Sequence, residues 1–457
     1  MPATEQTAGT TISEAGTARL AIVVPVAVIS FFYASILEYA LPLYFGALGE
    51  AAEKVGVSYP TEIWSELVKY QVTPWIVGPV LAGLLARRYG ERVVWSGALI
   101  GKVFVPLALA VSPDPTTIKI IAVWQGFTGA MMWIAGISLV QMVVPSKKAR
   151  SNALLMTALG IGSLFGPVVG RFLLYRGPLG PLISQQEWSL LGVKLLALEP
   201  LTAPPRVEEF YLIFWVLMVS TLVCGVVVGL WGQRPGKFTR DKTDDWKSTW
   251  KDLSELVSET RFWALVIALA VLGGPVFQAS NQFLPYRAEE MGLKSGAADE
   301  GWIWLQLLKT LMWIPGGLAI GLLAGRRVVG LFAVGILGAF SVAALSIGLS
   351  DTSWMLFASV ACFEFVRQFM RWSHGGYMSE HMPTRLRATA IGCTITFSGL
   401  GSTIYAWLAA LWWSPQEADF HAADPFMAAF VLGALGAIGL FCFDRIVPIR
   451  RAVNETQ

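Results

Sequence analysis

Long apolar runs alternate with short polar breaks along the chain, from residue 19 to residue 447. A helix that crosses a bilayer core of about 30 Å needs about 20 predominantly apolar residues. Runs of roughly this length occur at 19–47, 62–87, 93–112, 117–144, 150–174, 208–232, 262–287, 301–325, 328–349, 352–381, 386–413 and 424–447. The pattern therefore predicts an all-α integral membrane protein with twelve transmembrane helices.

The composition points to the same class of protein. Only 14% of the 457 residues are charged, against roughly 25% in soluble proteins, so lipid must cover much of the surface. The net charge of +3 leaves no single-signed patch that would attract nucleic acid. The four cysteines lie inside apolar runs, and no metal-binding or catalytic motif is present. We expect a monomer in the lipid bilayer, without enzyme activity, metal or cofactor.

Basic residues are concentrated in alternate loops. These loops hold Arg87, Arg88 and Arg92, then Lys147, Lys148 and Arg150, then Arg326 and Arg327, then Arg385 and Arg387. The positive-inside rule assigns such loops to the cytoplasm. Both termini are then cytoplasmic, as an even number of spans requires, and the expected location is the cytoplasmic (inner) membrane.

Two connections are longer than a turn. Residues 172–207, on the predicted outer side, contain an amphipathic stretch around Trp188 to Leu198 that we expect to lie on the membrane surface or to cap the outer mouth. Residues 233–261, on the predicted inner side, carry Trp246, Trp250 and Leu253 at helical spacing. This second connection is either an interfacial helix or a solvated linker anchored by its tryptophans.

The sequence also contains an internal repeat. Its anchors are Trp75 with Trp313, Gly83 with Gly321, and Pro145 with Pro383, each pair 238 positions apart. The repeat divides the chain into a six-helix bundle over 1–232, a linker over 233–261 and a second six-helix bundle over 262–457. Transporters built from such parallel repeats bind solute at the interface between the halves, near the membrane midplane.

The loop after the second span reads Gly-Leu-Leu-Ala-Arg-Arg-Tyr-Gly-Glu-Arg over residues 83–92. It resembles the loop signature of the major facilitator superfamily, whose pattern is matched by Gly83, Leu85, Ala86, Arg88, Gly90 and Arg92. Arg87 replaces the acidic residue that, in that family, helps to latch the halves shut on the cytoplasmic side. The resemblance implies two six-helix pseudo-repeats, alternating access and a gating role for Gly83, Arg88, Gly90 and Arg92.

The fifth span carries a second gating motif, made of Gly162, Gly166, Pro167 and Gly170. It is similar to the glycine-proline pattern of antiporters in the same family, although Arg171 stands where a further glycine is usual. Small residues four apart let helix backbones approach closely, and a proline bends the helix. We expect this span to pack tightly against a neighbour and to bend during transport.

The tenth span contains charges that cannot face lipid. Glu364, Arg367, Arg371 and His374 are spaced to share one helix face. A charge at the bilayer centre costs at least about 2.5–3.5 kcal/mol, so the face must line a cavity or meet a partner. Pairing of Glu364 with Arg367 would leave Arg371 as a cation for a carboxylate or phosphate. Whether the pair is structural or takes part in coupling is left open.

Further buried polar residues lie in the outer parts of both halves. Glu38 lies in the outer part of the first span, at a depth similar to that of Lys69 in the second span and Lys309 in the eighth, and we expect Lys69 to be within reach of it. The counterpart of Glu38 in the seventh span is Asn281, with Gln282 beside it. A carboxylate on one side and amides on the other can hold an asymmetric solute. Glu38 is also the first candidate for carrying a coupling proton, because burial favours the protonated form of a carboxylate.

Together these features predict a secondary active transporter that moves a small organic solute by alternating access, with possible coupling to protons. An anion is favoured because Lys69, Lys309, Arg367 and Arg371 outnumber Glu38 and Glu364. Export of an amphipathic or hydrophobic compound is the alternative, favoured by the fifth-span glycines and the aromatic content. A membrane sensor that binds without transport is a further alternative.

Overall fold

The structure is a computed structural model that describes residues 23–37, 40–41, 44–45, 47–48, 63–111, 114–143, 148–176, 188–190, 193–196, 207, 210–231, 251, 254–258, 260–293, 300–323, 330–381, 387–413 and 421–446. The first half contains the helical segment Val23–Leu37, α2 (Ile63–Val72), the 3-10 helix η1 (Thr73–Ile76), α3 (Gly78–Tyr89), α4 (Glu91–Gly101), α5 (Phe104–Val111), α6 (Pro115–Val143), α7 (Lys148–Arg176) and α8 (Phe210–Trp231). The second half contains α10 (Thr260–Leu265), the π-helix η4 (Val266–Leu272), α11 (Gly274–Glu290), α12 (Glu300–Leu311), α13 (Trp313–Leu323), α14 (Gly330–Gly348), α15 (Ser353–His381), α16 (Arg387–Trp412) and α17 (Asp424–Ile446). Every predicted transmembrane run contains a helix.

Six helical stretches in the described part are long and apolar enough to cross a membrane. They are Glu91–Val111, Pro115–Ile137, Phe210–Leu230, Phe262–Glu290, Gly392–Trp412 and Asp424–Phe443. The outward faces of these helices carry large exposed apolar side chains such as Trp215 and Leu435. Such faces suit a lipid solvent and would be unfavourable in water.

Among the described residues, the second, third, seventh and eighth predicted spans are each interrupted by a break that hydropathy alone does not show. The second span consists of α2, η1 and α3, with Pro74 at the start of η1 and Pro79 at the start of α3. The third span breaks at Lys102, which lies in a turn between α4 and α5. Proline supplies no backbone N–H, so a helix is easily interrupted where one occurs.

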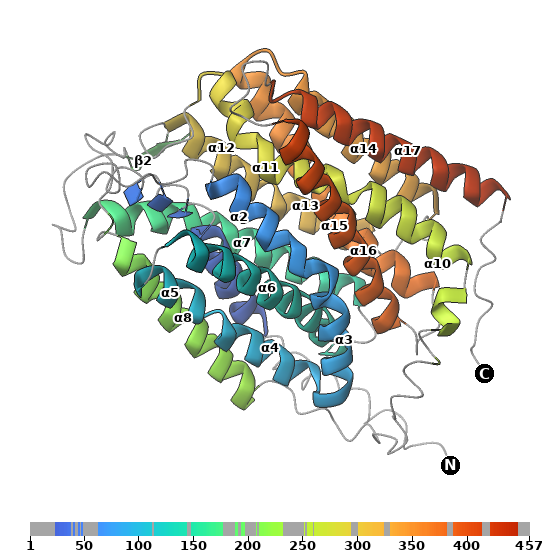
Figure 1. The fold of residues 1–457 in the computed structure, drawn as a ribbon, viewed down its shortest axis with the longest axis horizontal. Coiled ribbons are helices and arrows are strands. Elements are labelled where there is room, and N and C mark those ends of the chain that lie inside the picture. Colours follow the sequence, from blue (N-terminus) through green and yellow to red (C-terminus); the bar gives the residue numbers. More distant parts are fainter. Residues whose placement is uncertain are drawn as a thin grey trace.

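The two halves lie side by side, with α2 to α8 on one side and α10 to α17 on the other (Figure 1). They meet along two seams, where α7 packs on α13 and where α16 packs on η1 and α3. An added Cβ on Gly160 of α7 would lie 3.1 Å from the backbone of Trp313. An added Cβ on Gly399 of α16 would lie 2.6 Å from the carbonyl oxygen of Trp75. The repeat anchors Trp75 and Trp313 therefore occupy matching places in the two seams.

The repeat is equally visible inside each half. A Cβ on Gly162 of α7 would overlap the carbonyl oxygen of Val28 in the first span. In the second half, a Cβ on Gly401 of α16 would overlap the carbonyl oxygen of Val271 in η4. Both contacts depend on a glycine that lets two helix backbones touch. The structure thus confirms the two six-helix pseudo-repeats.

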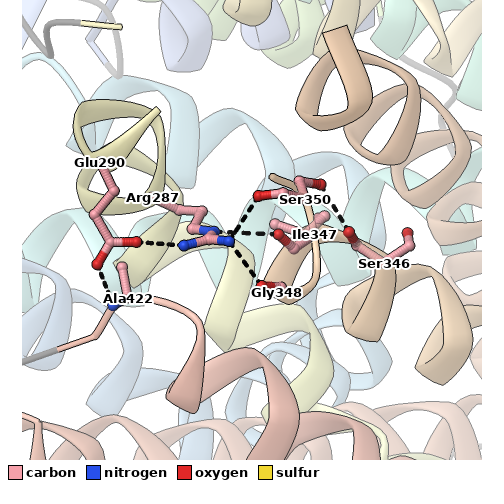
Figure 2. Close-up of polar contacts among 7 residues, drawn as sticks. All are labelled: Arg287, Glu290, Ser346, Ile347, Gly348, Ser350 and Ala422. Atoms are coloured by element: carbon pink, nitrogen blue, oxygen red, sulfur yellow. Dashed lines mark hydrogen bonds and ion pairs between the residues drawn. The ribbon is translucent and has the colours of Figure 1, made fainter. Parts of the chain in front are cut away.

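The predicted outer end of the second half is held by Arg287 of α11 (Figure 2). Its guanidinium donates to the carbonyl oxygens of Ile347 at 3.4 Å, Gly348 at 2.8 Å and Ser350 at 2.7 Å. It also pairs with Glu290, whose other oxygen accepts from the backbone N–H of Ala422 at 2.6 Å. A cation satisfies the free carbonyls at the end of a helix, so Arg287 joins α11, α14 and the chain entering α17.

The first half has a corresponding brace with different chemistry. Tyr44 lies two residues after Pro42, as Arg287 lies two residues after Pro285. The hydroxyl of Tyr44 donates to the carbonyl oxygen of Leu109 at 2.7 Å. Leu109 and Ile347 are 238 positions apart, so the repeat-related carbonyls accept from repeat-related side chains.

The amphipathic stretch around Trp188 to Leu198 takes a form that the sequence did not specify. Its described residues form two antiparallel strands, β1 (Trp188–Leu190) and β2 (Val193–Leu196). Its place on the membrane surface or over the outer mouth stays a prediction. Alternation of apolar and polar residues over so few positions fits a helix or a strand, and the pairing of the two strands decides between them. Of the 233–261 linker, the described part includes a short helical stretch over 254–258.

Candidate functional site

A buried ion pair lies in the tenth span, on α15. Arg367 Nη1 donates to Glu364 Oε1 at 2.9 Å, across the i to i+3 spacing of the helix. The exposed fraction of the side chain is 6% for Arg367 and 0% for Glu364. The predicted pairing is confirmed, and the two charges are withdrawn from both lipid and water.

Residues from two other spans complete this pair. The indole Nε1 of Trp313 in α13 donates to Glu364 Oε2 at 2.7 Å. Arg367 Nη2 donates to Asn281 Oδ1 of α11 at 3.0 Å, and the guanidinium lies 5.4 Å from the ring centroid of Phe277. The seventh, eighth and tenth spans therefore meet at one cluster of charge. Such partners are needed, because a buried ion is stable only when its hydrogen bonds are also made.

Several buried polar atoms on α11 and α15, the helices that carry Asn281 and Arg367, have no hydrogen-bond partner among the described residues. They include Arg367 Nε, Gln278 Nε2, Gln282 Oε1 and both amide atoms of Gln368. Gln282 makes one bond, a 3.4 Å donation to the carbonyl oxygen of Ala406. Buried polar groups in native proteins are nearly always bonded to protein, water or ligand. These atoms can therefore receive water or a polar solute.

The charged residues that the tenth span brings to this cluster have uncharged counterparts in the fourth span. Glu364, Arg367 and Gln368 correspond, 238 positions earlier, to Gly126, Gly129 and Ala130. A Cβ on Gly126 would overlap the carbonyl oxygen of Gln71, so the fourth span packs directly on the second. The same place in the fold is filled by helix packing in one half and by charges in the other.

Lysines lie in or beside the interior at three further places. Lys69 Nζ lies 5.5 Å from the ring centroid of Trp407, which makes this lysine a contact between the halves. Lys102 is 3% exposed and lies 4.9 Å from the ring centroid of Tyr33. Lys309 is 8% exposed, and no described residue makes a hydrogen bond or ion pair with it.

The structure describes only part of the predicted site, and the roles of its residues in substrate binding stay predictions. It brings Arg367 and Asn281 together, and places Gln282 on the neighbouring face of the same helix against α16. Glu38 and the side chain of Arg371 lie outside the described residues. The pairing of Lys69 with Glu38 therefore stays a prediction.

Sequence reasoning missed three residues of the cluster. Trp313 was recognised as an anchor of the repeat, with no role in the site. Phe277 and Gln368 carried no signal of their own, although each lies on the same helix as a predicted site residue. Only the packing of α11 and α13 against α15 brings Phe277 and Trp313 to the ion pair, whereas Gln368 follows Arg367 on α15 itself.

A family model described as the Major Facilitator Superfamily matches residues 23–406. The chain belongs to this superfamily. It is accordingly a multi-pass membrane protein and a transporter.

Solved transporters of the superfamily share its fold. The E. coli fucose:proton symporter FucP aligns with a TM-score of 0.64 and 14% identity, over 94% of this chain and 99% of that one. The human organic anion transporter MFSD10 (TETRAN) aligns with a TM-score of 0.63 and 12% identity, over 93% and 99%. At these identities the similarity shows the fold alone.

Curated relatives cover a smaller part. Putative multidrug resistance protein MdtD of Yersinia pestis and of Yersinia pseudotuberculosis is 33% identical over 140 residues. This match takes in 30% of the chain and 28% of the relatives' length. The chain therefore resembles them over less than a third of their sequence.

The loop signature of the superfamily covers the second half of α3, Gly90 between the helices and the first turn of α4. Gly90 has a φ of +88°, a backbone conformation that favours glycine over other residues. Arg88 lies over the ring of Tyr89, 5.5 Å from its centroid, and Glu91 opens the first turn of α4. Gly83 has no heavy atom within 4 Å of an added Cβ. The roles of Gly83, Arg88 and Arg92 in gating stay a prediction.

The fifth-span motif faces the first span. Ser35 Oγ donates to the carbonyl oxygen of Ser163 at 2.6 Å, and a Cβ on Gly166 would lie 2.5 Å from the Cβ of Ser35. Pro167 lies within α7, and Gly170 is buried one turn further on. The close approach expected of this major facilitator motif is present.

Proposed function

We propose that this transporter moves a small organic anion by alternating access, with the solute bound between the halves beside Arg367. The observation that carries the proposal is the sign of the buried charge. Among the described residues, the buried charged side chains are Lys102, Arg287, Lys309, Arg367 and Glu364. Arg287 and Arg367 are set against carboxylate partners, whereas Lys309 has no hydrogen-bond or ion-pair partner among the described residues, so its positive charge is not offset there.

An excess of buried cations is unfavourable unless an anion offsets it. Two unit charges at about 6 Å interact by roughly 3 kcal/mol at an effective dielectric constant of about 20. An entering carboxylate would gain from Lys309 and from the unpartnered Nε of Arg367, and the free amides of Gln278 and Gln368 would bind its other polar atoms. MFSD10 is an organic anion transporter, which agrees with the proposal, but the shared fold alone does not carry it.

Proton coupling belongs to the same proposal. Glu38 and Glu364 are the carboxylates that would load and release protons, and Glu364 would do so beside Arg367. The transporter would work as a monomer in the cytoplasmic membrane with both termini in the cytoplasm. Replacement of Glu38 by Gln tests the coupling, since uptake that still depends fully on a pH gradient would remove Glu38 from this role.

The substrate class is tested by uptake into proteoliposomes preloaded for counterflow. The probes are labelled benzoate, succinate, glucuronate and inorganic phosphate, with tetraphenylphosphonium as a lipophilic cation. Lys309→Gln leaves no described partner orphaned, and we expect it to raise the KM for a transported anion at least about tenfold. Lys251→Gln, at an exposed position outside the spans, is the matched control and is expected to leave KM unchanged.

Export of an amphipathic compound is the second candidate. It is favoured by the 140-residue match to a putative multidrug resistance protein. Transport of tetraphenylphosphonium with no counterflow of any of the four anions would favour this candidate over the first. Counterflow of any probe would exclude a sensor that binds without transport.

A further inference from the structure

Trp313 touches both the buried ion pair and the opposite half of the molecule. Its indole Nε1 donates to Glu364 Oε2 at 2.7 Å. Its ring packs with Leu159 of α7, in a small cluster that also includes Phe31 and Trp133 from the first half. Phe31 and Trp133 meet edge to face, with their ring centroids 5.8 Å apart. One side chain therefore connects the site to the seam between the halves.

The seam leaves the indole little room to move. Trp313 is only 7% exposed. A Cβ on Gly160 would lie 2.9 Å from the backbone nitrogen of Ile314 and 3.1 Å from the carbonyl carbon of Trp313. Close-packed interfaces change by switching between arrangements, since they do not deform continuously. A shift of the indole would require α7 and α13 to repack.

The repeat provides a natural comparison. Trp75 occupies the equivalent place in the other seam, where its backbone packs against Gly399. The positions that correspond to Glu364 and Arg367 beside Trp75 are Gly126 and Gly129. An added Cβ on Gly129 would lie 3.9 Å from the Trp75 ring. Two tryptophans thus pack alike in the seams, and only Trp313 is bonded to a buried carboxylate from the tenth span.

We propose that Trp313 is a positioning residue that links the state of the Arg367–Glu364 pair to the contact between the two halves. The proposal rests on the proposed function only in taking this pair as part of the solute site. Glu364 accepts hydrogen bonds from both Arg367 Nη1 and the indole N–H. When a solute draws Arg367 away, or a proton neutralises Glu364, the bond to the indole changes in strength. The indole then favours a different packing of α7 on α13.

The link is tested without any solute, by measuring the distance between spin labels on opposite halves. The labels replace Val111 and Trp354, which are 75% and 71% exposed and lie at the predicted outer ends of the third and tenth spans. The four native cysteines are first replaced by alanine, and the protein is placed in vesicles of phosphatidylethanolamine and phosphatidylglycerol. Pulsed electron double resonance then gives the ratio of open to closed molecules.

Trp313→Phe keeps a ring and removes the N–H donor. We expect it to change the open-to-closed ratio at least about fivefold, which is the lower end of typical allosteric coupling. Glu364→Gln should shift the ratio in the same direction, and the double variant should show no further shift. Trp75→Phe removes the same ring area in the other seam. Its effect on the open-to-closed ratio should be independent of that of Glu364→Gln, so the two fold-changes should multiply in the double variant.

Trp313→His tests whether the effect of Trp313→Phe comes from the lost N–H donor and not from altered packing. In one flipped orientation of the ring, its Nε2–H occupies the position of the indole N–H, so it should restore the parental ratio. An unchanged ratio in Trp313→Phe would overturn the proposal. The proposal would also be overturned if the fold-changes in the open-to-closed ratio caused by Trp313→Phe and by Glu364→Gln simply multiplied in the double variant, as is expected for Trp75→Phe and Glu364→Gln. Because no solute is used, neither result depends on whether the protein transports anions.

Discussion

The structural and the functional contributions of the buried Arg367–Glu364 pair can be measured separately with two variants. Arg367→Met removes the guanidinium and leaves Glu364, with an exposed fraction of 0%, bonded to Trp313 as its remaining described hydrogen-bond partner outside its own helix. Adding Glu364→Gln removes the second charge as well. The single variant therefore contains a buried carboxylate that has lost its described cationic partner, and the double variant contains neither charge of the pair.

The magnitude follows from these contacts. Breaking a buried ion pair by removing one partner costs about 3–5 kcal/mol, whereas replacing both partners is often neutral or stabilising. The lost bond from Arg367 to Asn281 adds only about 0.6 kcal/mol, which is the average measured for side-chain hydrogen bonds within a membrane bundle. The loss of the cation beside the buried Glu364 therefore dominates the change in the free energy of unfolding. We expect the free energy of unfolding to fall by about 4 kcal/mol in the single variant and to recover to within about 1 kcal/mol in the double variant.

The assay combines unfolding in mixed micelles, followed by circular dichroism, with counterflow of a transported anion. If the pair serves transport, the double variant is stable but keeps less than about a tenth of the parental uptake. Recovery of uptake together with stability would refute this reasoning and show that the pair only fixes the helices. A single variant as stable as the parent would refute the assigned energetics.

Two further predictions concern the packing of the halves. Gly162→Ala forces a methyl group onto the carbonyl oxygen of Val28 and should lower the free energy of unfolding by about 1–3 kcal/mol, whereas Gly83→Ala has open space and should not lower it, as the same micelle titration will measure. Equal effects of the two substitutions would contradict the close approach. Arg287→Met removes several charge-assisted bonds and should destabilise by about 3 kcal/mol or more, against about 1 kcal/mol for the single neutral bond lost in Tyr44→Phe. A larger loss for Tyr44→Phe in the same unfolding measurement would show that the braces do not contribute according to their charge.

Much of the architecture follows from the sequence because its causes are local. Hydrophobicity over a window of about 20 residues decides whether a helix enters the bilayer, and all twelve predicted runs contain helices. Spacing along one helix placed Arg367 within reach of Glu364, and the pair is formed. The 238-residue repeat likewise revealed that Trp75 and Trp313 are equivalent. The domain boundaries at 232 and 262 stay predictions.

Other features could not be obtained in this way. The hydropathy of the third span is continuous, yet the helix breaks at Lys102, where Tyr33 of the first span donates to its carbonyl oxygen at 3.0 Å. The stretch beginning at Trp188 has a pattern that fits a helix or a hairpin, and it forms the hairpin. The local pattern permits a continuous or a broken helix in the third span, and a helix or strands in the stretch from Trp188. Contacts with other parts of the chain decide between these conformations.

The sequence by itself determined that the protein is a twelve-helix membrane transporter of two similar halves, with buried charges concentrated in the second. Only the tertiary structure decided which residues those charges meet. Trp313 is 51 positions from Glu364, and Asn281 is 86 positions from Arg367. Such contacts depend on how whole helices pack and rotate against one another. That packing is set by many weak contacts along each helix, and no single segment of sequence specifies it.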